Sequence, residues 1–318
     1  MPNKLQADLA SSLFHLMQNP FQLSRPQSRV DNLIACAGLL LLLIPGSVSC
    51  DPYISSWAPG PKSALRLIAA GGPASGAYHA GVEIQLDPGA FTYWRMPGSA
   101  GIPPVFSFDG STNAAEITVS YPAPDRIVDD GIEVFGYRDH VIFPLRVKPQ
   151  DAANPVRLAL SLSYGVCAGL CLPGRGEAAL TFFPENGGGA SVSPEARRVA
   201  AADALVPVRL SPQDRDAKIA ITREETALLP TWRLSLRSGS AEDLFAEAPQ
   251  GWYFETRAAG QPNEFSIIEV ERPREASPKR PPVILTLKNE QKSYEFAVDL
   301  DAASGRAKGA QAAPKSIP

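Results

Sequence analysis

The stretch that decides the fold is Tyr164-Gly-Val-Cys167-Ala-Gly-Leu-Cys171-Leu-Pro173, in which two cysteines stand 4 positions apart. The run before it, Val156-Arg-Leu-Ala-Leu-Ser-Leu-Ser-Tyr164, alternates apolar with small or polar residues, which is the period of a half-buried strand. Ala178-Ala-Leu-Thr-Phe-Phe183 reads as the returning strand. The cysteines therefore lie where a hairpin turns, and Gly169 gives the backbone freedom to bend. Two sulfurs on so short a loop can form either a structural bond or a redox couple.

The composition favours an exported globular protein over one that binds nucleic acid. The 318 residues carry a formal charge of -3, so there is no electrostatic reason to expect nucleic acid as a partner. Two of the 4 cysteines, Cys36 and Cys50, lie in or beside an export signal, which leaves one pair in the exported part. Export would place that pair in a compartment where disulfides persist.

Residues 1–50 are predicted to be a signal segment. Arg25 and Arg29 precede an apolar core at residues 33–44, and small residues follow it up to Cys50. The core is too short for a comfortable membrane span, which needs about 20 apolar residues. Cleavage near Cys50 is the first expectation. The small residues before Cys50 also resemble a lipoprotein box, which would tether the protein to a membrane, although Ser47 stands where a leucine-like residue is expected.

Short strands separated by turn signals fill residues 57–185, and this pattern is typical of an all-β sandwich. No helix is predicted in this first domain. The predicted strands, in addition to the two around the cysteines, are residues 63–69, 78–86, 91–95, 105–108, 115–121 and 141–147.

The second half reads as a linker and helix at residues 186–210, a small β-rich domain at 211–300 and a disordered tail at 301–318. The helix is predicted to begin with Ser193 at its N-cap. A short helical turn is predicted at residues 241–245. Because this half contains no cysteine or histidine, it cannot carry redox or metal chemistry, and a docking or spacing role is expected. The predicted strands are residues 218–223, 231–237, 252–256, 265–270, 283–287 and 294–298.

Several motifs of the first domain together resemble a known family, the N-terminal periplasmic domain of the thiol:disulfide interchange protein DsbD. The likeness is closer to the relatives of this family that are tied to copper-sensitivity suppression, and it covers about residues 63–185. The motifs occur in a fixed order: Gly89-Ala-Phe-Thr-Tyr-Trp-Arg-Met-Pro-Gly98, Gly101-Ile-Pro-Pro104, Asp130-Gly-Ile-Glu-Val-Phe-Gly-Tyr137, Leu145-Arg-Val147 and Tyr164-x-x-Cys167-x-x-x-Cys171-x-Pro173.

The resemblance implies an immunoglobulin-like sandwich in the periplasm whose Cys167 and Cys171 pass electrons by disulfide exchange. Such an activity is protein-disulfide reductase-like and needs no cofactor or metal. The implied partners are a membrane electron-donor protein and periplasmic thiol proteins. In that family a loop with an aromatic residue caps the cysteines, and the matching residues 130–137 place Val134 or Phe135 in the capping position. The chain departs from the founding members in its shorter cysteine spacing.

Disulfide exchange needs a thiolate that attacks one sulfur and a second thiol that resolves the mixed disulfide. A nucleophilic thiol needs a lowered pKa, which a nearby cation or hydrogen-bond donor can supply. Tyr164, which lies 3 residues before Cys167, is predicted to be such a donor. Arg175 is the nearest cation in sequence, and Arg95, His140 or a backbone amide are the candidates from elsewhere in the fold. The sequence does not say which cysteine attacks.

Two alternatives to exchange remain open at this stage. The bond can be a structural one in a non-catalytic binding or assembly sandwich, with a stabilisation near the low end of about 2–4 kcal/mol because the loop is small. The two thiolates with His140 would also suit Cu(I), as in a copper-handling protein. Under exchange, a Cys171→Ser variant is expected to trap an adduct with a partner. Tyr93 and Trp94 are expected to pack in the core or a loop, with partner contact as the alternative reading.

Overall fold

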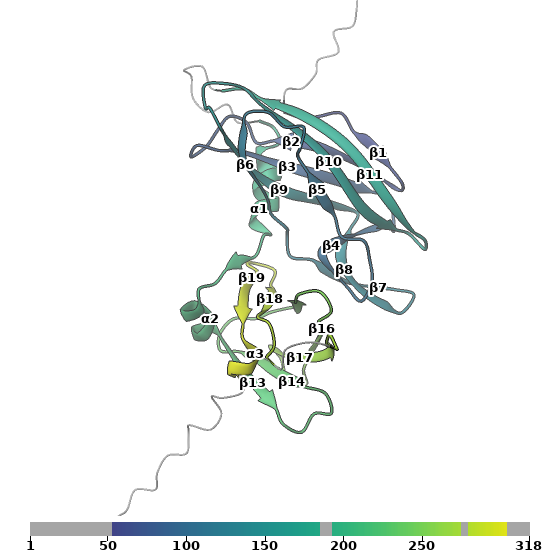
Figure 1. Ribbon diagram of the computed structural model, residues 1–318, viewed down its shortest axis with the longest axis vertical. Helices are drawn as coiled ribbons and strands as arrows, with labels where there is room; N and C mark the ends of the chain where they lie inside the picture. Colours follow the sequence, from purple (N-terminus) through teal and green to yellow (C-terminus); the bar gives the residue numbers. More distant parts are fainter. Residues whose placement is uncertain (1–52, 185–192, 275–278, 304–318) are drawn as a thin grey trace, which may run out of the picture. The chain divides into compact units, whose positions relative to one another are not determined.

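The computed structural model describes residues 53–184, 193–274 and 279–303, which form two β-sandwiches and three short helices (Figure 1). The predicted signal segment, with Cys36 and Cys50, lies outside the described residues. In the part of the chain that is described, no helix is both long enough and apolar enough to cross a lipid bilayer.

One sheet of the first sandwich has the strand order β1-β2-β3-β9-β6, with antiparallel pairing throughout. The strands β2 and β3 have the bounds that the apolar alternation predicts. The bounds are β1 Ala58–Gly60, β2 Ser63–Ala69, β3 Tyr78–Leu86, β6 Ala114–Val119 and β9 His140–Pro149.

The other sheet has the order β11-β10-β4-β8-β7, and the short strand β5 pairs with β10. The strands β10 and β11 form the predicted cysteine hairpin. The stretch of residues 130–137, which the resemblance assigned to a capping loop, forms the turn and most of the second strand of the hairpin β7–β8. The bounds are β4 Phe91–Gly98, β5 Val105–Ser107, β7 Asp125–Asp129, β8 Ile132–Arg138, β10 Val156–Cys167 and β11 Cys171–Phe182.

The two sheets enclose a continuous apolar core. Every second residue of β10 from Val156 to Val166 is buried, because alternate side chains of a strand face the same side of the sheet. Trp94, Tyr78 and Phe143 are among the largest fully buried side chains of this core. The predicted all-β class, an immunoglobulin-like sandwich followed by a second β-rich domain, is confirmed.

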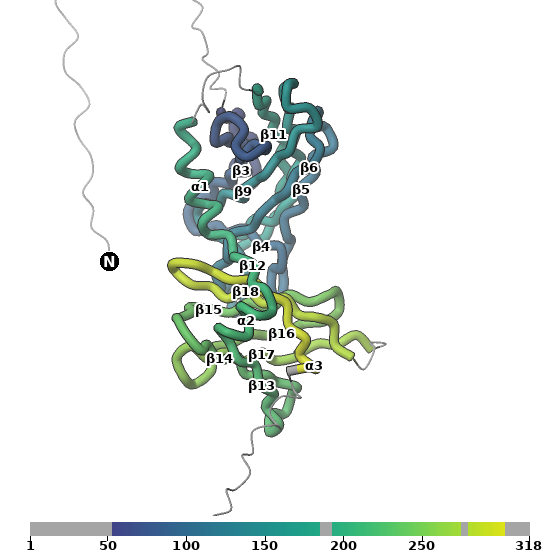
Figure 2. The backbone as a smooth tube through the Cα atoms, turned by 90° about the vertical axis from the view of Figure 1, so that its left-hand side faces the viewer, coloured from purple at the N-terminus to yellow at the C-terminus, as the bar shows by residue number. Residues whose placement is uncertain are grey.

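Helix α1, Ala196–Ala204, packs on the outer face of the first sandwich, and Figure 2 shows it alongside β3 and β9. Val199 and Ala202 lie 3 positions apart on one helix face and contact Ile68 and Ile142 of the sheet. The predicted N-cap is wrong, because the N-cap residue is Glu195. Ser193 instead bonds to the end of β2, donating its hydroxyl to the Ala69 carbonyl and its N–H to the carbonyl of Ala70 at 3.1 Å.

A buried carboxylate fixes this helix to the sandwich. Glu83 on β3 has a side chain that is 4% exposed, and it binds Arg66 at 2.7 Å, His140 at 2.8 Å and Arg198 of α1. Burial alone would raise the pKa of Glu83, but hydrogen bonds from His140, Arg66 and Arg198 outweigh it and hold the pKa at about 2. Glu83 is therefore ionised at every physiological pH.

The second sandwich consists of two four-stranded sheets, ordered β12-β19-β18-β15 and β13-β14-β17-β16. Its separate core includes Trp232, Leu234 and Phe254. The bounds are β12 Val208–Arg209, β13 Ile219–Glu224, β14 Thr231–Leu236, β15 Asp243–Glu247, β16 Tyr253–Ala258, β17 Glu264–Glu271, β18 Val283–Lys288 and β19 Tyr294–Val298.

Two short helices flank these sheets. Helix α2, Pro212–Lys218, begins at Ser211, whose hydroxyl oxygen accepts the Asp214 N–H at 3.2 Å as an N-cap. Helix α3, Leu300–Ala303, receives the indole N–H of Trp232 on the Leu300 carbonyl at 2.9 Å. The helical turn predicted at residues 241–245 is wrong, because Asp243–Glu247 is strand β15, paired with β18. Leu244 and Phe245 point to opposite faces of that strand, and each face is buried.

The two sandwiches belong to one compact unit and share apolar and ionic contacts. Phe245 of β15 joins the core of the first sandwich, with its ring centroid 4.9 Å from that of Phe135 and 5.9 Å from that of Trp94. Arg95 of β4 donates to both carboxylate oxygens of Glu247, at 2.8 and 2.6 Å.

Candidate functional site

Cys167 and Cys171 close the hairpin β10–β11 and form a disulfide. The two strands pair without interruption from Val156 opposite Phe182 to Cys167 opposite Cys171, so the cysteines are the last pair of the ladder. Gly169 in the connecting loop has a φ of 73°, a left-handed conformation that favours glycine. The predicted hairpin and its glycine are therefore confirmed.

The two cysteines differ in exposure. Cys167 is fully buried, whereas Cys171 and the loop residue Leu170 are exposed. Gly165 and Cys167 alternate with the core-facing residues of β10, so the disulfide lies on the outer face of the sheet and apart from the sandwich core. A molecule in solution can approach the Cys171 side of the bond, while the surrounding side chains shield the other sulfur.

A tyrosine hydroxyl contacts both sulfurs. The Tyr93 oxygen lies 2.8 Å from Cys167 Sγ and 3.3 Å from Cys171 Sγ. The hydroxyl is the donor in both contacts, since the sulfurs of a disulfide carry no hydrogen. Burial raises the pKa of Tyr93, and the negative charge of Asp129 raises it further, so the hydroxyl keeps its proton at neutral pH.

Two glycines make room for the Tyr93 ring. A Cβ on Gly165 would lie 2.8 Å from the ring, and one on Gly101 would lie 2.4 Å from it. The Gly165 N–H donates to the Ile102 carbonyl at 3.1 Å, which holds the two glycine-containing segments on either side of the ring. The Thr92 hydroxyl donates to the Gly165 carbonyl at 2.8 Å and ties β4 to β10 at the same level.

Two residues of the hairpin β7–β8 complete the cover of Cys167. Ile127 and Val134 form one buried cluster with Cys167, Tyr93 and Phe91. Phe135, the other predicted capping residue, belongs to the sandwich core instead. Neighbouring residues of a strand point to opposite faces, so only one of the pair Val134 and Phe135 can lie on the side of the cysteines.

Tyr164, the donor predicted from its place in sequence, lies on the core side of β10. Its hydroxyl is 2.8 Å from the Ser63 hydroxyl. Burial raises the pKa of Tyr164, although the hydrogen bond to Ser63 lowers it. A separation of 3 residues within a strand places side chains on opposite faces, which is why Tyr164 and Cys167 do not meet. The Tyr93 hydroxyl makes the contact with sulfur that was expected of Tyr164, and no local sequence signal connects Tyr93 with the cysteines.

The candidate cations are engaged away from the sulfurs. Arg95 pairs with Glu247 and with Glu295 of the second sandwich, His140 binds Glu83, and Arg175 lies 3.3 Å from Glu177. Within the described ranges no group of three or more His, Cys, Asp or Glu side chains is placed to hold a metal ion. Among the described residues, the Tyr93 hydroxyl is the polar side-chain group seen within hydrogen-bond distance of both sulfurs.

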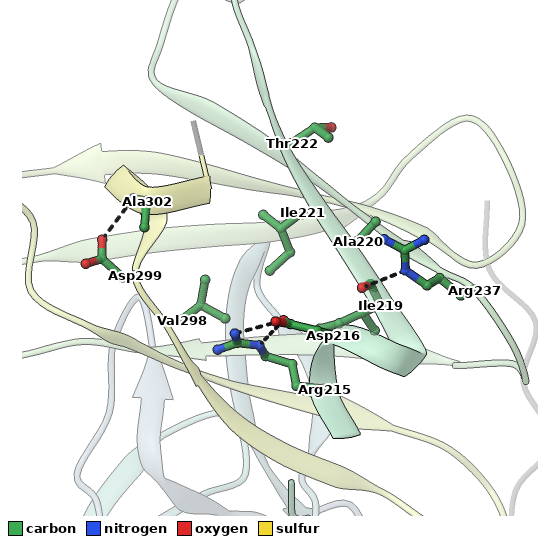
Figure 3. A pocket seen from close by; sticks show the side chains of 10 residues that line it. All are labelled: Arg215, Asp216, Ile219, Ala220, Ile221, Thr222, Arg237, Val298, Asp299 and Ala302. Carbon is green, nitrogen blue, oxygen red and sulfur yellow. Dashed lines mark hydrogen bonds and ion pairs between the residues drawn. The ribbon is translucent and has the colours of Figure 1, made fainter. Parts of the chain in front are cut away.

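The second sandwich has a pocket of about 470 Å³ between β13, α2 and the end of β19 (Figure 3). Its charged side chains already have partners within the same region. Arg215 pairs with Asp216 at 2.8 Å, and Arg237 donates to the Ile219 carbonyl at 3.2 Å. Asp299 accepts the Ala302 N–H at 3.1 Å. The remaining lining is mostly apolar, and it contains no cysteine or histidine.

The geometry defines a class of protein: an immunoglobulin-like sandwich that carries a hairpin disulfide beneath a buried tyrosine. Residues 61–182 match the family described as thiol:disulfide interchange protein DsbD, N-terminal. The chain therefore contains a DsbD N-terminal-like domain, which confirms the resemblance inferred from its motifs. No curated protein matches the chain.

One solved structure extends the likeness in fold beyond the matched residues. The crystal structure of the N-terminal periplasmic domain of ScsB from Proteus mirabilis has a TM-score of 0.60 at 19% identity, over 78% of this chain and 98% of that one. At this identity the likeness shows the fold alone. The endo-fucoidan hydrolase MfFcnA4 from glycoside hydrolase family 107 has a TM-score of 0.16 at 11% identity, over 73% of this chain and 38% of that one, so its fold differs.

Proposed function

We propose that this protein is an exported thiol–disulfide exchange module that passes reducing equivalents through the Cys167/Cys171 couple to partner proteins. The observation that carries the proposal is the asymmetry of the couple, in which an exposed Cys171 is bonded to a buried Cys167. Exchange needs one sulfur that a partner can reach and a second that is held close by to resolve the adduct. A purely structural bond needs neither property.

In the forward reaction the Cys171 thiolate of the dithiol form attacks a disulfide of the partner. The partner's S–S bond breaks, a mixed disulfide forms between Cys171 and one partner sulfur, and the other partner sulfur leaves as a thiolate. The Cys167 thiolate then attacks Cys171 Sγ, which re-forms the Cys167–Cys171 bond and releases the second partner thiolate. Two electrons pass to the partner, whose thiolates take up two protons. A dithiol of the electron donor reverses these steps and is itself oxidised.

Tyr93 is proposed to assist by donating a hydrogen bond to the thiolate. Its hydroxyl lies within reach of both sulfurs in the disulfide form, so the same donor can serve either thiolate as the bond opens. A hydrogen bond to the charged form lowers the pKa of a thiol and increases the fraction that is nucleophilic. We assign Cys167 and Cys171 as the exchanging pair, Tyr93 as the donor, and Ile127 with Val134 as the cap.

The partners and the compartment follow from the resemblance and are also proposals. A membrane electron donor would reduce the couple, and periplasmic thiol proteins would oxidise it. The matched solved domain is itself described as periplasmic, which supports this location. Lipidation of Cys50 would tether the protein to a membrane.

Reduction potential is the first test, measured by alkylation and intact mass across a series of thiol buffers. A value above roughly -250 mV places the couple among those that exchange, whereas a value below about -300 mV marks a resistant structural bond and refutes the proposal.

Trapping is the second test. Since Cys171 is the exposed sulfur, Cys167→Ser is the variant expected to accumulate mixed disulfides with partners, and Cys171→Ser is its matched control. This reverses the choice of variant made from sequence. Equal adduct yields from the two variants would contradict the assigned order of attack.

A further inference from the structure

The hairpin β7–β8 has one face toward Cys167 and one toward strand β15 of the second sandwich. Its register pairs Ile127 with Val134 and Arg126 with Phe135. Ile127 and Val134 join the buried cluster around Cys167. Because neighbouring residues on a strand point to opposite sides, Arg126 and Phe135 face away from the disulfide. Contacts to the face with Arg126 and Phe135 therefore also restrain the face that covers Cys167.

The second sandwich holds that face through a forked ion pair. Arg126 donates from Nε to Asp243 Oδ2 at 2.9 Å and from Nη2 to Asp243 Oδ1 at 2.7 Å. The same Nη2 donates to the Leu244 carbonyl at 2.9 Å. Glu133 of β8 also binds this guanidinium, so the cation links both strands of the hairpin to β15. A bidentate, charge-assisted contact fixes orientation as well as distance.

An aromatic contact lies beside the ion pair. The Phe245 ring is fully buried and meets Phe135 edge to face, with centroids 4.9 Å apart. The Arg126 guanidinium lies 5.1 Å from the Phe135 ring and 5.3 Å from the Phe245 ring. These three side chains form a mixed stack between the hairpin and β15, and such aromatic and cation–π contacts add to the burial of apolar area.

Within its own sheet the hairpin is supported on one side, where β8 pairs with β4. Strand β7 is the edge of its sheet, and the pairing of β4 with β8 is irregular between Tyr93 and Gly98. Val128 and Ile132, close to the turn, are 64% and 50% exposed. A two-stranded hairpin is marginally stable on its own in water. Beyond the pairing of β8 with β4, the contacts of Arg126 and Phe135 with β15 restrain this hairpin on the side away from Cys167.

We infer that the second sandwich is a positioning element for the disulfide. Asp243 pairs with Arg126, Phe245 packs on Phe135, and these contacts keep the hairpin β7–β8 closed over Cys167. This inference rests on the proposed function and adds how access to the couple is set. With the hairpin closed, nucleophiles and electrophiles reach Cys171 alone. When the contacts of Asp243 and Phe245 with the hairpin are lost, the hairpin opens and Cys167 becomes reactive as well.

The test measures which thiol reacts in the full chain. The protein is reduced, treated briefly with iodoacetamide, quenched and digested, and the carbamidomethylation of Cys167 and Cys171 is read by peptide mass. The rate at Cys167 is divided by the rate at Cys171. A change that affects both thiols equally therefore leaves this ratio unaltered. In Asp243→Asn and Phe245→Leu we expect this ratio to rise about tenfold, which corresponds to about 1.4 kcal/mol of closing free energy.

Two further variants make the result specific. Asp243→Glu keeps the charge and is expected to return the ratio toward the wild-type value. Asp301→Asn removes a carboxylate that pairs with Arg280 inside the second sandwich, away from the hairpin, and should leave the ratio unchanged. An unchanged ratio in Asp243→Asn, or an equal rise in Asp301→Asn, overturns the inference. If Phe245→Leu does not fold, Asp243→Asn decides alone.

This outcome is separable from that of the proposed function. The iodoacetamide ratio needs no partner and no particular reduction potential, so a resistant structural bond would refute exchange while leaving the positioning role measurable. Conversely, a couple that exchanges but shows no change of the ratio in Asp243→Asn would retain the function and refute the positioning role.

Discussion

In the first sandwich, the hairpin β10–β11 ends in a disulfide with one exposed cysteine, whereas residues 186–318 contain neither cysteine nor histidine. The second sandwich has a pocket of about 470 Å³ whose charged groups pair with one another or with backbone. The difference shows that the cysteine pair and the pocket lie on different sandwiches, so the exchange proposed above would use an exposed hairpin end and no cavity. The second sandwich contacts the first through Phe245 and Glu247.

The largest effect should come from Cys171→Ser, which removes the reachable sulfur. We expect complete loss of thiol exchange, because the remaining Cys167 is fully buried and has no partner to resolve an adduct. The measurement is the rate at which the dithiol form reduces a model disulfide. Substantial residual exchange would break the comparison, since reactivity would then lie outside the exposed hairpin end.

Removal of the buried charge should have the next largest effect, on stability alone. Glu83→Gln leaves Arg66 and Arg198 without their carboxylate, and we expect a loss of up to about 3 kcal/mol at neutral pH. The folded pKa of Glu83 is about 2 against an ordinary value of 4.5. A depressed pKa contributes stability that is present above 4.5 and is lost as the pH falls through 2. The free energy of unfolding, measured with denaturant between these pH values, should therefore depend less on pH in Glu83→Gln than in the wild type.

The second sandwich offers the matched case for this prediction. Burial would raise the pKa of Asp301, but hydrogen bonds from the Arg280 backbone and side chain hold it lower. Asp301 is more exposed than Glu83. Asp301→Asn should therefore lower the free energy of unfolding by less, and should change its dependence on acidic pH by less, than Glu83→Gln. Equal losses of unfolding free energy in Glu83→Gln and Asp301→Asn would show that burial does not decide how much each carboxylate stabilises the fold.

Tyr93→Phe is expected to change the redox couple by a smaller amount. Loss of a hydrogen bond to a charged group is worth about 1.5 kcal/mol, so the cysteine thiol pKa should rise by about one unit. The dithiol form loses the corresponding stabilisation, and the reduction potential should fall by about 30 mV. Alkylation rate against pH and equilibration with thiol buffers measure the two quantities. A potential that does not move would remove Tyr93 from the proposed site.

The smallest effect should come from Tyr164→Phe, the control for Tyr93→Phe. The variant loses the contact between the Tyr164 and Ser63 hydroxyls, which should lower the free energy of unfolding by about 1 kcal/mol. Because Tyr164 faces the core side of β10, the reduction potential should stay at the wild-type value. A shift in potential as large as that of Tyr93→Phe would show that burial, and not contact with sulfur, sets the potential.

The sequence contained the local part of this arrangement and lacked the non-local part. Alternation from Val156 to Tyr164, the return at residues 178–183 and Gly169 between the cysteines were sufficient to predict the hairpin. Tyr93 lies 74 positions before Cys167, and no local period connects them. The contact depends on the register of β4 against β10 and on the space left by Gly101 and Gly165, which only the assembled sheet defines.

Errors at the level of single elements have the same origin. Ser193 followed by proline has the form of a helix start, but its hydroxyl donates to the buried Ala69 carbonyl at the end of β2. The stretch from Ala241 to Phe245 was predicted to be a short helical turn, but pairing with β18 makes Asp243–Glu247 a strand. Tertiary partners overrode local propensity in both cases.

The uninterrupted ladder of β10 and β11 has a consequence for repeated use of the couple. The cysteines are its terminal pair, so the hydrogen bonds of the ladder, and not the S–S bond, bring the two sulfurs together. We expect the strands to stay paired when the bond opens, which keeps each thiol at a high effective concentration near the other. Closing the bond again is then a small local movement. Under the proposed function, the couple would then open and close repeatedly without refolding of the hairpin.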